Sequence, residues 1–359
     1  MEVEEKRVLD FFENNSLVLE IPPYQRIYSW MPRQCFELWL DIARAGRDKH
    51  DHFSGIMIFT RGKEGAEDID RLEVIDGQQR LTTMTLLLEA FARYLEKLGH
   101  HEGLPTAEDV RGLLYAKSST GSGERKLILS REDDMAIANA LSGTGADQDW
   151  SKHISANLKF FEERMAEEDF DPTVLWSGLG RLTIIACFED NPNHAQEIFE
   201  SANSKGLPLT LTDLVRNYLL LEESLEEQKR LYDEYWAEAA DLFAPDPGST
   251  KMNAAITAWI SIRFRARKVG NSEFVYSKFK RYVEDEYEGE LVTVLEELRA
   301  FCFMWREQYR YHAVRKFRSR PWAINGASTL TQRFQKKKAD NPEQAESLWK
   351  KLDSIDEKW

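Results

Sequence analysis

The stretch "VIDGQQRLTT", residues 74–83, joins a strand pattern to a helix pattern, and the fold can be worked out from it. Val74 and Ile75 are β-branched and suit a buried strand. Asp76 and Gly77 permit a tight turn, because glycine takes backbone angles closed to other residues. An apolar pattern typical of a helix follows. Between strand and helix lies an unusual density of hydrogen-bonding side chains, which belong to Gln78, Gln79, Arg80, Thr82 and Thr83.

This turn has the chemistry that a phosphate site needs. The first turn of a helix offers unpaired N–H groups and the positive end of the helix dipole, which both favour anions. Arg80 adds a planar cation suited to phosphate oxygens, and Asp76 could hold a magnesium ion or a water. Gln78 and Gln79 could orient a water or a base. In the alternative interpretation, Asp76 caps the helix and Arg80 forms a surface ion pair.

The pattern on either side of the turn predicts an α+β N-terminal domain with a small mixed sheet, followed by an all-α domain. We expect the first domain at 1–195, with a mostly helical insertion at about 103–180, and the second at 196–359. Two polar, glycine-containing stretches of the insertion, 118–124 and 141–149, are typical of mobile loops. The expected strands are 17–21, 52–60, 71–75 and 181–189. The expected helices are 7–15, 33–46 (ended by Gly46), 79–98, 212–240, 250–268, 272–288 and 291–318.

A second unusual stretch is "IPPYQRIYSW", residues 21–30. Its prolines favour an extended chain, in which Tyr24, Tyr28 and Trp30 are interleaved with Gln25 and Arg26. Aromatic rings beside arginine and glutamine can stack on a base and bond to its edge. On the residues alone, packing of these rings in a strand-to-helix linker is an equally good interpretation.

A third is "IFESANSKGLPLTLTDLVRNYLL", residues 198–220, which predicts two helices joined at a corner. Asn203, Lys205, Arg216 and Asn217 place polar groups near that corner, and Gly206 suits the turn. An ordinary helix–loop–helix without a ligand is the simpler interpretation.

Composition narrows the class of protein. At 359 residues, 42% apolar and 31% charged, the chain is globular and long enough for two domains. The stretch "MEVEEKRVLD", residues 1–10, is acidic and amphipathic, which is not the pattern expected of a secretory signal. No apolar run of about 18 residues that would span a membrane occurs in the sequence. Three widely spaced cysteines without a CxxC pair fit a reducing cytoplasm. The GxSxG, HExxH and P-loop patterns are absent, and the histidines have no metal-ligand spacing.

The net charge of −14 argues against nonspecific binding of nucleic acid by the whole surface. The charge is uneven, however, because residues 261–338 contain 18 lysines and arginines against 9 aspartates and glutamates. These basic residues could contact phosphates, or they could be interleaved charges on solvated helix faces.

Together, "IPPYQRIYSW", "HFSGIMIF", "VIDGQQRLTT" and "FESANSKGLPLTLTDLVRNYLL" resemble the DGQQR-motif family with a ParB/sulfiredoxin-like N-terminal domain. Its members include the modification-dependent restriction enzyme GmrSD and the phosphorothioate-defence protein SspE. The resemblance covers roughly residues 5–220 by motif. Four motifs in the right order make it specific, whereas an isolated DGxxR would be weak.

The resemblance implies that Asp76–Arg80 lie at a nucleotide site that supports hydrolysis of a nucleoside triphosphate (NTP) with magnesium. Asp76 would hold the metal, Gln78 and Gln79 would place the attacking water, and Arg80 would stabilise phosphate charge. Other expected nucleotide contacts are Gly77, Thr82, Thr83, Asn203, Lys205 and Gly206. The expected residues for sensing DNA or a base are Tyr24, Gln25, Arg26, Tyr28 and Trp30, and Asp213, Arg216 and Asn217 would close the cleft from the helical side.

One departure from the family is the missing nuclease. Restriction-type members continue into an HNH-like domain with a histidine-containing metal site, but after Asn193 this chain has only His194 and His312. We therefore expect a regulatory NTPase of a cytoplasmic prokaryotic defence system, either as a fragment of a longer protein with a nuclease domain or subunit, or as a chain that works alone. DNA, in modified or ordinary form, and a second copy of the chain are the expected partners. The alternative is a non-catalytic module that binds DNA or protein through the aromatic cleft and basic helices, and a vestigial nucleotide site is a third possibility.

Overall fold

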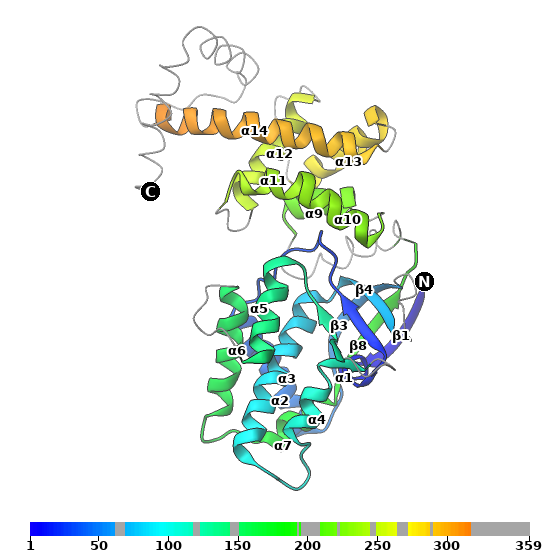
Figure 1. Ribbon diagram of the computed structural model, residues 1–359, viewed down its shortest axis with the longest axis vertical. Coiled ribbons are helices and arrows are strands. Elements are labelled where there is room, and N and C mark those ends of the chain that lie inside the picture. Colours follow the sequence, from blue (N-terminus) through cyan, green and yellow to red (C-terminus); the bar gives the residue numbers. More distant parts are fainter. Residues whose placement is uncertain are drawn as a thin grey trace. The chain divides into compact units, whose positions relative to one another are not determined.

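The computed structural model describes residues 1–61, 69–117, 123–143, 151–191, 194, 209–220, 223–244, 249–263, 272–287 and 290–316. The chain divides into two compact units, which Figure 1 traces by colour along the sequence. The first unit contains Met1–Pro208 and Leu221–Gln228, and the second contains Leu209–Leu220 and Lys229–Trp359. The expected Asn203, Lys205 and Gly206 contacts lie outside the described residues, as does most of the two expected mobile loops.

The first unit is built on a six-stranded mixed sheet in the order β1-β8-β3-β4-β2-β7. The neighbouring strands β3 and β8 run parallel, with His52 opposite Leu182, and β1 pairs antiparallel with the other edge of β8. A separate pair, β5-β6, is antiparallel. The strands are β1 (Glu2–Arg7), β2 (Leu17–Glu20), β3 (His52–Arg61), β4 (Asp70–Asp76), β5 (Tyr115–Lys117), β6 (Gly123–Arg125), β7 (Leu127–Ile128) and β8 (Leu182–Phe188).

Helices complete the core of this unit. One face of the sheet, including Met57 and Phe59 of β3 and Ile184 of β8, shares a buried cluster with Leu81 and Leu88 of the long helix α3. Burial of this apolar surface is the main source of stability for the unit. The helices are α1 (Val8–Glu13), α2 (Pro32–Asp48), α3 (Gln78–Leu98), α4 (Ala107–Gly112), α5 (Arg131–Ser142), α6 (Lys152–Met165) and α7 (Pro172–Leu179).

The second unit is helical in its described part. Trp259 and Phe279 pack in its interior, with ring centroids 6.0 Å apart, and Trp236 is also buried. The expected long helix at 212–240 is divided, because α9 ends at Leu220, α10 begins at Leu225, and a π-helical turn follows α10. The elements are α9 (Leu211–Leu220), α10 (Leu225–Leu231, which begins in the first unit), η2 (Tyr232–Trp236), α11 (Ala237–Asp241), α12 (Thr250–Arg263), α13 (Ser272–Tyr287) and α14 (Leu291–Lys316).

The expected α+β class is confirmed, with the mixed sheet in the first part of the chain and helices after it. Strands at 17–21, 52–60, 71–75 and 181–189 are confirmed as β2, β3, β4 and β8. The sequence patterns missed β1 and the three short strands β5–β7, and they ended α2 too early, at Gly46. None of the described helices is long and apolar enough to cross a membrane.

Candidate functional site at the start of helix α3

The turn between β4 and α3 depends on Gly77, the residue that precedes the helix. Its φ of 113° is one that L side chains rarely adopt, and a Cβ there would lie 2.8 Å from Cγ of Met57. The backbone N–H of Gly77 donates to Oδ1 of Asp76 at 2.8 Å, so Asp76 stabilises the turn. The chain therefore enters α3 with its first backbone N–H groups directly after a buried strand.

Arg80 lies against the backbone of β3. Its Nη1 donates to the carbonyl oxygen of Ser54 at 2.7 Å, and Nη2 donates to that of Ile56. The register of β3 against β8 shifts at this point, and Gly55 between the two carbonyls has a φ of 105°. A Cβ on Gly55 would lie 2.5 Å from the Arg80 guanidinium, so glycine is what admits the arginine. An isolated glycine within the strand pattern is the sequence signal for such a bulge.

Two arginines act electrostatically on the Asp76 carboxylate. Arg80 Nη2 lies 3.6 Å from Asp76 Oδ2, and both side chains are mostly buried. Burial raises the pKa of Asp76, whereas Arg80, the Gly77 N–H and Arg26 each act to lower that pKa. Burial also lowers the pKa of Arg80, against the opposing effect of Asp76. Two guanidinium groups that act on one carboxylate favour an anionic ligand at this turn.

Gln79 holds the loop at residues 21–31. Its Oε1 accepts the backbone N–H groups of Ser29 and Trp30 at 2.8 and 3.1 Å, and its Nε2 donates to the carbonyl of Ile27 at 3.4 Å. One turn later, Thr83 Oγ1 lies 2.7 Å from the hydroxyl of Tyr28. The loop and the start of α3 are thus one hydrogen-bonded unit.

The predicted aromatic stretch is brought to this turn. Gln25 Nε2 donates to the carbonyl of Ile75 at 2.7 Å, directly beside Asp76. Tyr24 and Tyr28 are fully buried, so neither ring presents a face for stacking in this conformation, whereas Arg26 and Trp30 are partly exposed. A role for this stretch in sensing DNA or a base stays a prediction.

Two buried side-chain atoms of the motif have no hydrogen-bond partner in the described part of the chain. Nε2 of Gln78 and Oγ1 of Thr82 are buried, and neither makes a hydrogen bond to the described part of the chain. The residues are 4% and 0% exposed, and their spacing of four places them on one face of α3. Across the same described ranges, the backbone N–H groups of Gln78, Gln79 and Arg80 also have no acceptor. The start of α3 therefore has hydrogen-bonding capacity that the protein does not use.

Metal binding was predicted at Asp76. Among the described residues there is no group of three or more His, Cys, Asp or Glu that could hold an ion, and metal binding at Asp76 stays a prediction. One carboxylate is still sufficient for Mg²⁺ that arrives on the phosphates of a nucleotide, because Mg²⁺ there keeps several waters and takes few protein ligands.

The residues predicted to close the cleft lie on α9, in the second unit. Asp213 and Arg216 are buried and paired, with Oδ1 and Nη2 2.8 Å apart, and Asn217 is buried beside them. The Arg216 guanidinium also lies 6.0 Å from the ring centroid of Trp236. The ion pair lies within α9, and the contact with Trp236 joins α9 to η2 of the same unit. A role of these residues at the nucleotide site stays a prediction.

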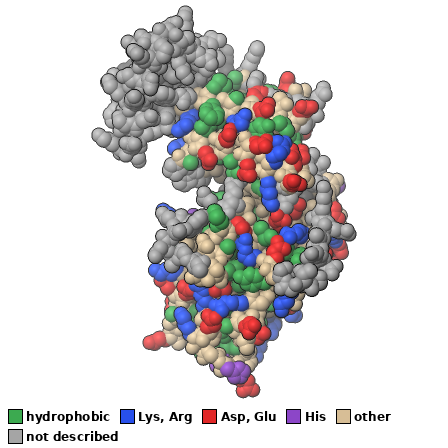
Figure 2. All heavy atoms as spheres, in the orientation of Figure 1, with side chains coloured by type: hydrophobic (Ala, Val, Ile, Leu, Met, Phe, Trp, Pro, Cys, Tyr) green, Lys and Arg blue, Asp and Glu red, His purple; other side chains and the backbone are tan. Residues whose placement is uncertain are grey.

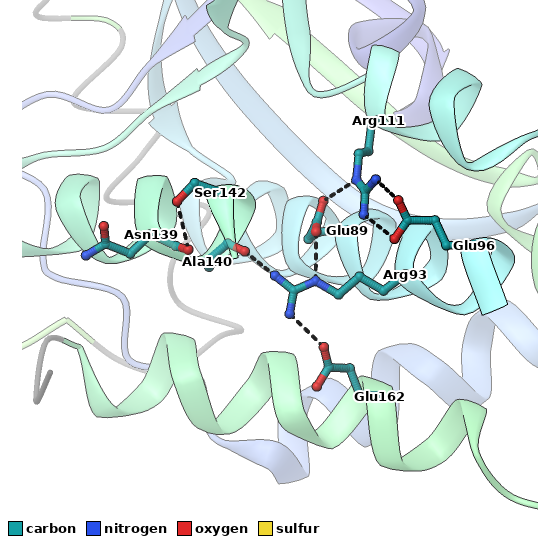
Figure 3. A network of polar contacts seen from close by, with 8 residues as sticks. All are labelled: Glu89, Arg93, Glu96, Arg111, Asn139, Ala140, Ser142 and Glu162. Carbon is teal, nitrogen blue, oxygen red and sulfur yellow. Dashed lines mark hydrogen bonds and ion pairs between the residues drawn. The ribbon is translucent and has the colours of Figure 1, made fainter. Parts of the chain in front are cut away.

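A charged network fixes α3 to the helices around it (Figure 3). Glu89 is 2% exposed and lies between Arg93, at 2.8 Å, and Arg111, at 3.5 Å. Arg93 also contacts Glu162 of α6 and a backbone carbonyl of α5, and Arg111 reaches Glu96. The first and last turns of α3 are thus held by different partners. Elsewhere, on the face drawn in Figure 2, acidic and basic side chains of the described residues are interspersed.

Comparison with models of known protein families assigns the chain to one family. The family model described as "GmrSD restriction endonuclease, N-terminal domain" matches residues 8–220. These residues run from α1 to the end of α9 and include all four motifs. No curated protein sequence matches the chain. The match covers more than half of the sequence, and the turn at Asp76–Arg80 lies within it. The chain belongs to the family of the GmrSD restriction endonuclease N-terminal domain.

Proposed function

We propose that this chain binds an NTP at the start of α3 and hydrolyses it, as the regulatory part of a prokaryotic restriction or antiphage system in the cytoplasm. Turnover would gate a DNA-directed activity of that system. The observation that carries the proposal is the unused hydrogen-bonding capacity of the motif. Within the described part of the chain, Nε2 of Gln78 and Oγ1 of Thr82 are buried without a partner, beside three backbone N–H groups without acceptors. Leaving a buried polar group unpaired costs about 1–3 kcal/mol, which a ligand would recover.

The phosphate groups are the part of the nucleotide that suits this turn. The N–H groups of Gln78, Gln79 and Arg80 point along the positive end of a 21-residue helix, where a phosphate is favoured. The partly exposed guanidinium of Arg80 provides positive charge at the same turn. Mg²⁺ would enter with the substrate, and Asp76 would supply its protein carboxylate.

Hydrolysis requires a water in line with the terminal phosphorus. The water would attack that phosphorus, the bond to the bridging oxygen would break, and a nucleoside diphosphate and inorganic phosphate would leave. Such chemistry depends mainly on positioning and on stabilising charge. We assign the positioning of the water to Gln78, because the Gln79 amide is committed to the loop and the Gln78 amide nitrogen is not.

Calorimetric titration with ATP, GTP, CTP and UTP in the presence of Mg²⁺, together with phosphate release, tests the proposal. We expect one or more nucleotides to bind to the wild type, Thr82→Val to weaken binding about tenfold, and Gln78→Leu to reduce turnover. Thr82→Val should not lower the unfolding temperature, because Oγ1 of Thr82 has no hydrogen-bond partner in the described part of the chain.

Thr85→Val is the matched control. Thr85 is buried on the next turn of α3, and its hydroxyl already donates to the carbonyl of Leu81 at 3.0 Å. Its removal should leave nucleotide affinity within about twofold of the wild type, a difference below 0.5 kcal/mol. Absence of nucleotide binding by the wild type, or equal affinities of Thr82→Val and Thr85→Val, would refute the proposal.

A further inference from the structure

Arg26 is bracketed by two side-chain amides that hold its neighbours onto the DGQQR turn. On one side, Gln25 donates to the carbonyl of Ile75, the residue before Asp76. On the other, the carbonyl of Ile27 accepts from Gln79, the residue before Arg80. Both residues that flank Arg26 in the chain are thus fixed to residues that flank the charged pair of the turn.

The remainder of the loop is held as firmly. The Tyr28 backbone N–H donates to a carboxylate oxygen of Asp133, and the Tyr28 hydroxyl lies within hydrogen-bonding distance of Thr83. Asn157, which is fully buried on α6, donates to the Tyr28 hydroxyl and to the carbonyl of Trp30 at 2.8 and 2.7 Å. With its neighbours anchored to α3, β4, α5 and α6, the backbone of Arg26 has little freedom to leave the turn.

The charges agree with this placement. Arg26 acts electrostatically on the Asp76 carboxylate, as Arg80 does. Arg80 already donates to two backbone carbonyls, which leaves fewer of its N–H groups for a ligand. A site for several phosphate oxygens would gain from a second guanidinium, and the neighbouring loop supplies one that is partly exposed.

We infer that Arg26 is the second phosphate-binding arginine of the nucleotide site, and that Gln25 and Gln79 are the positioning residues that hold it there. This inference rests on the proposed NTP binding at the start of α3. It assigns Arg26 to the nucleotide instead of to DNA or a base, and it gives Gln79 a structural task within the site in place of contact with water. The ligand class that the pair of arginines recognises is the triphosphate, whatever the base.

Arg26→Gln tests the ligand contact. We expect it to weaken binding of the Mg²⁺–NTP at least about tenfold, since a hydrogen bond to a charged group contributes about 1.5–3 kcal/mol. The effect should be smaller for the diphosphate, and Arg26→Lys should recover part of the loss. Arg33→Gln is the charge-matched control, because Arg33 is 85% exposed on α2 and pairs with Glu37. It should bind the NTP as the wild type does.

A double-mutant cycle tests the positioning role. Gln79→Met should weaken NTP binding in the wild-type background and have little further effect in the Arg26→Gln background, if Gln79 acts through Arg26. Additive losses would overturn the positioning role, and unchanged NTP affinity of Arg26→Gln would overturn the assignment of Arg26. In both cases the wild type still binds NTP, so the proposed function survives. If the wild type binds no NTP, the proposed function is refuted, and the role of Arg26 falls with it.

Discussion

At the scale of single residues, Gly77 occupies a position where a side chain has no room. We expect Gly77→Ala to destabilise the protein by about 2–4 kcal/mol, from backbone strain and from the contact with Met57 at 2.8 Å. Gly143→Ala is the control, because Gly143 also has a positive φ, 68°, but its Cβ would meet nothing within 4 Å. Urea unfolding of both variants measures the difference. Equal losses of stability would show that the Met57 contact costs nothing.

Lys126 predicts a dependence of stability on pH. Its side chain is fully buried and donates to the carbonyl of Phe12 at 2.6 Å, and burial lowers its pKa from 10.5 to about 8. Between pH 8 and 10.5 the unfolded chain holds a proton that the folded chain has released, so this lysine makes stability rise as pH rises through that window.

Lys126→Met should therefore be more stable than the wild type at pH 7, with an advantage that shrinks as the pH rises from 8 towards 10. The comparison of the two proteins at each pH cancels the opposite trend expected from Cys35, whose pKa burial raises to about 11. Urea unfolding in steps of half a pH unit measures it. A constant difference between the two proteins across the window would contradict the prediction.

The residues of the turn also show how far sequence reasoning reaches. Hydrogen-bonding capacity at 76–83 was visible in the sequence, because it exceeded what a strand-to-helix turn uses. The sequence did not show which of these side chains bind the protein's own backbone and which are left for a ligand. The carbonyls that bind Arg80 belong to a bulge on β3, and the N–H groups that occupy Gln79 belong to a distant loop. Backbone partners of this kind leave no trace in residue type, apart from Gly55.

At the scale of elements, α3 is fixed by the network around Glu89. We expect Glu89→Gln to cost roughly 1–3 kcal/mol, because a buried carboxylate that contacts Arg93 and Arg111 is removed, while both arginines keep a second partner. Glu96→Gln, at a half-exposed position of the same network, should cost less than about 1 kcal/mol. Thermal unfolding measures both variants, and equal costs would show that burial of Glu89 does not matter.

The ends of helices and strands could be predicted where the apolar periodicity determines them. The prediction was wrong where packing against another element determines them. The apolar patterns of β3, β4 and α3 were sufficient to place all three. Gly46 was expected to end α2, but the helix continues to Asp48, because Gly46 is a contact point with α7. A Cβ on Gly46 would lie 1.9 Å from the carbonyl oxygen of Val174, and one on Gly178 would lie 2.0 Å from that of Ile42. Contact between two helices far apart in sequence cannot be deduced from one helix.

At the scale of the whole molecule, the division into two units predicts that damage to one stays local. Asp213→Ala removes a buried carboxylate 2.8 Å from Arg216, which should destabilise the second unit by about 3 kcal/mol. Hydrogen exchange followed by mass spectrometry should show faster exchange in α9, α12 and α13. Peptides of β3 and β8 should exchange as in the wild type. Equal acceleration in both sets would mean that the two units unfold as one.

The position of β8 between β1 and β3 has a consequence for synthesis on the ribosome. The strands that flank it are complete by residue 61, but the strand that joins them is made only at residues 182–188. Until β8 is made, β3 has no partner on that edge, and β1 cannot join the sheet. A nascent chain stalled before residue 182 would leave the backbone N–H and C=O groups on the β8 side of Met57, Ile58 and Phe59 unpaired on an apolar strand edge, which is a surface that aggregates readily.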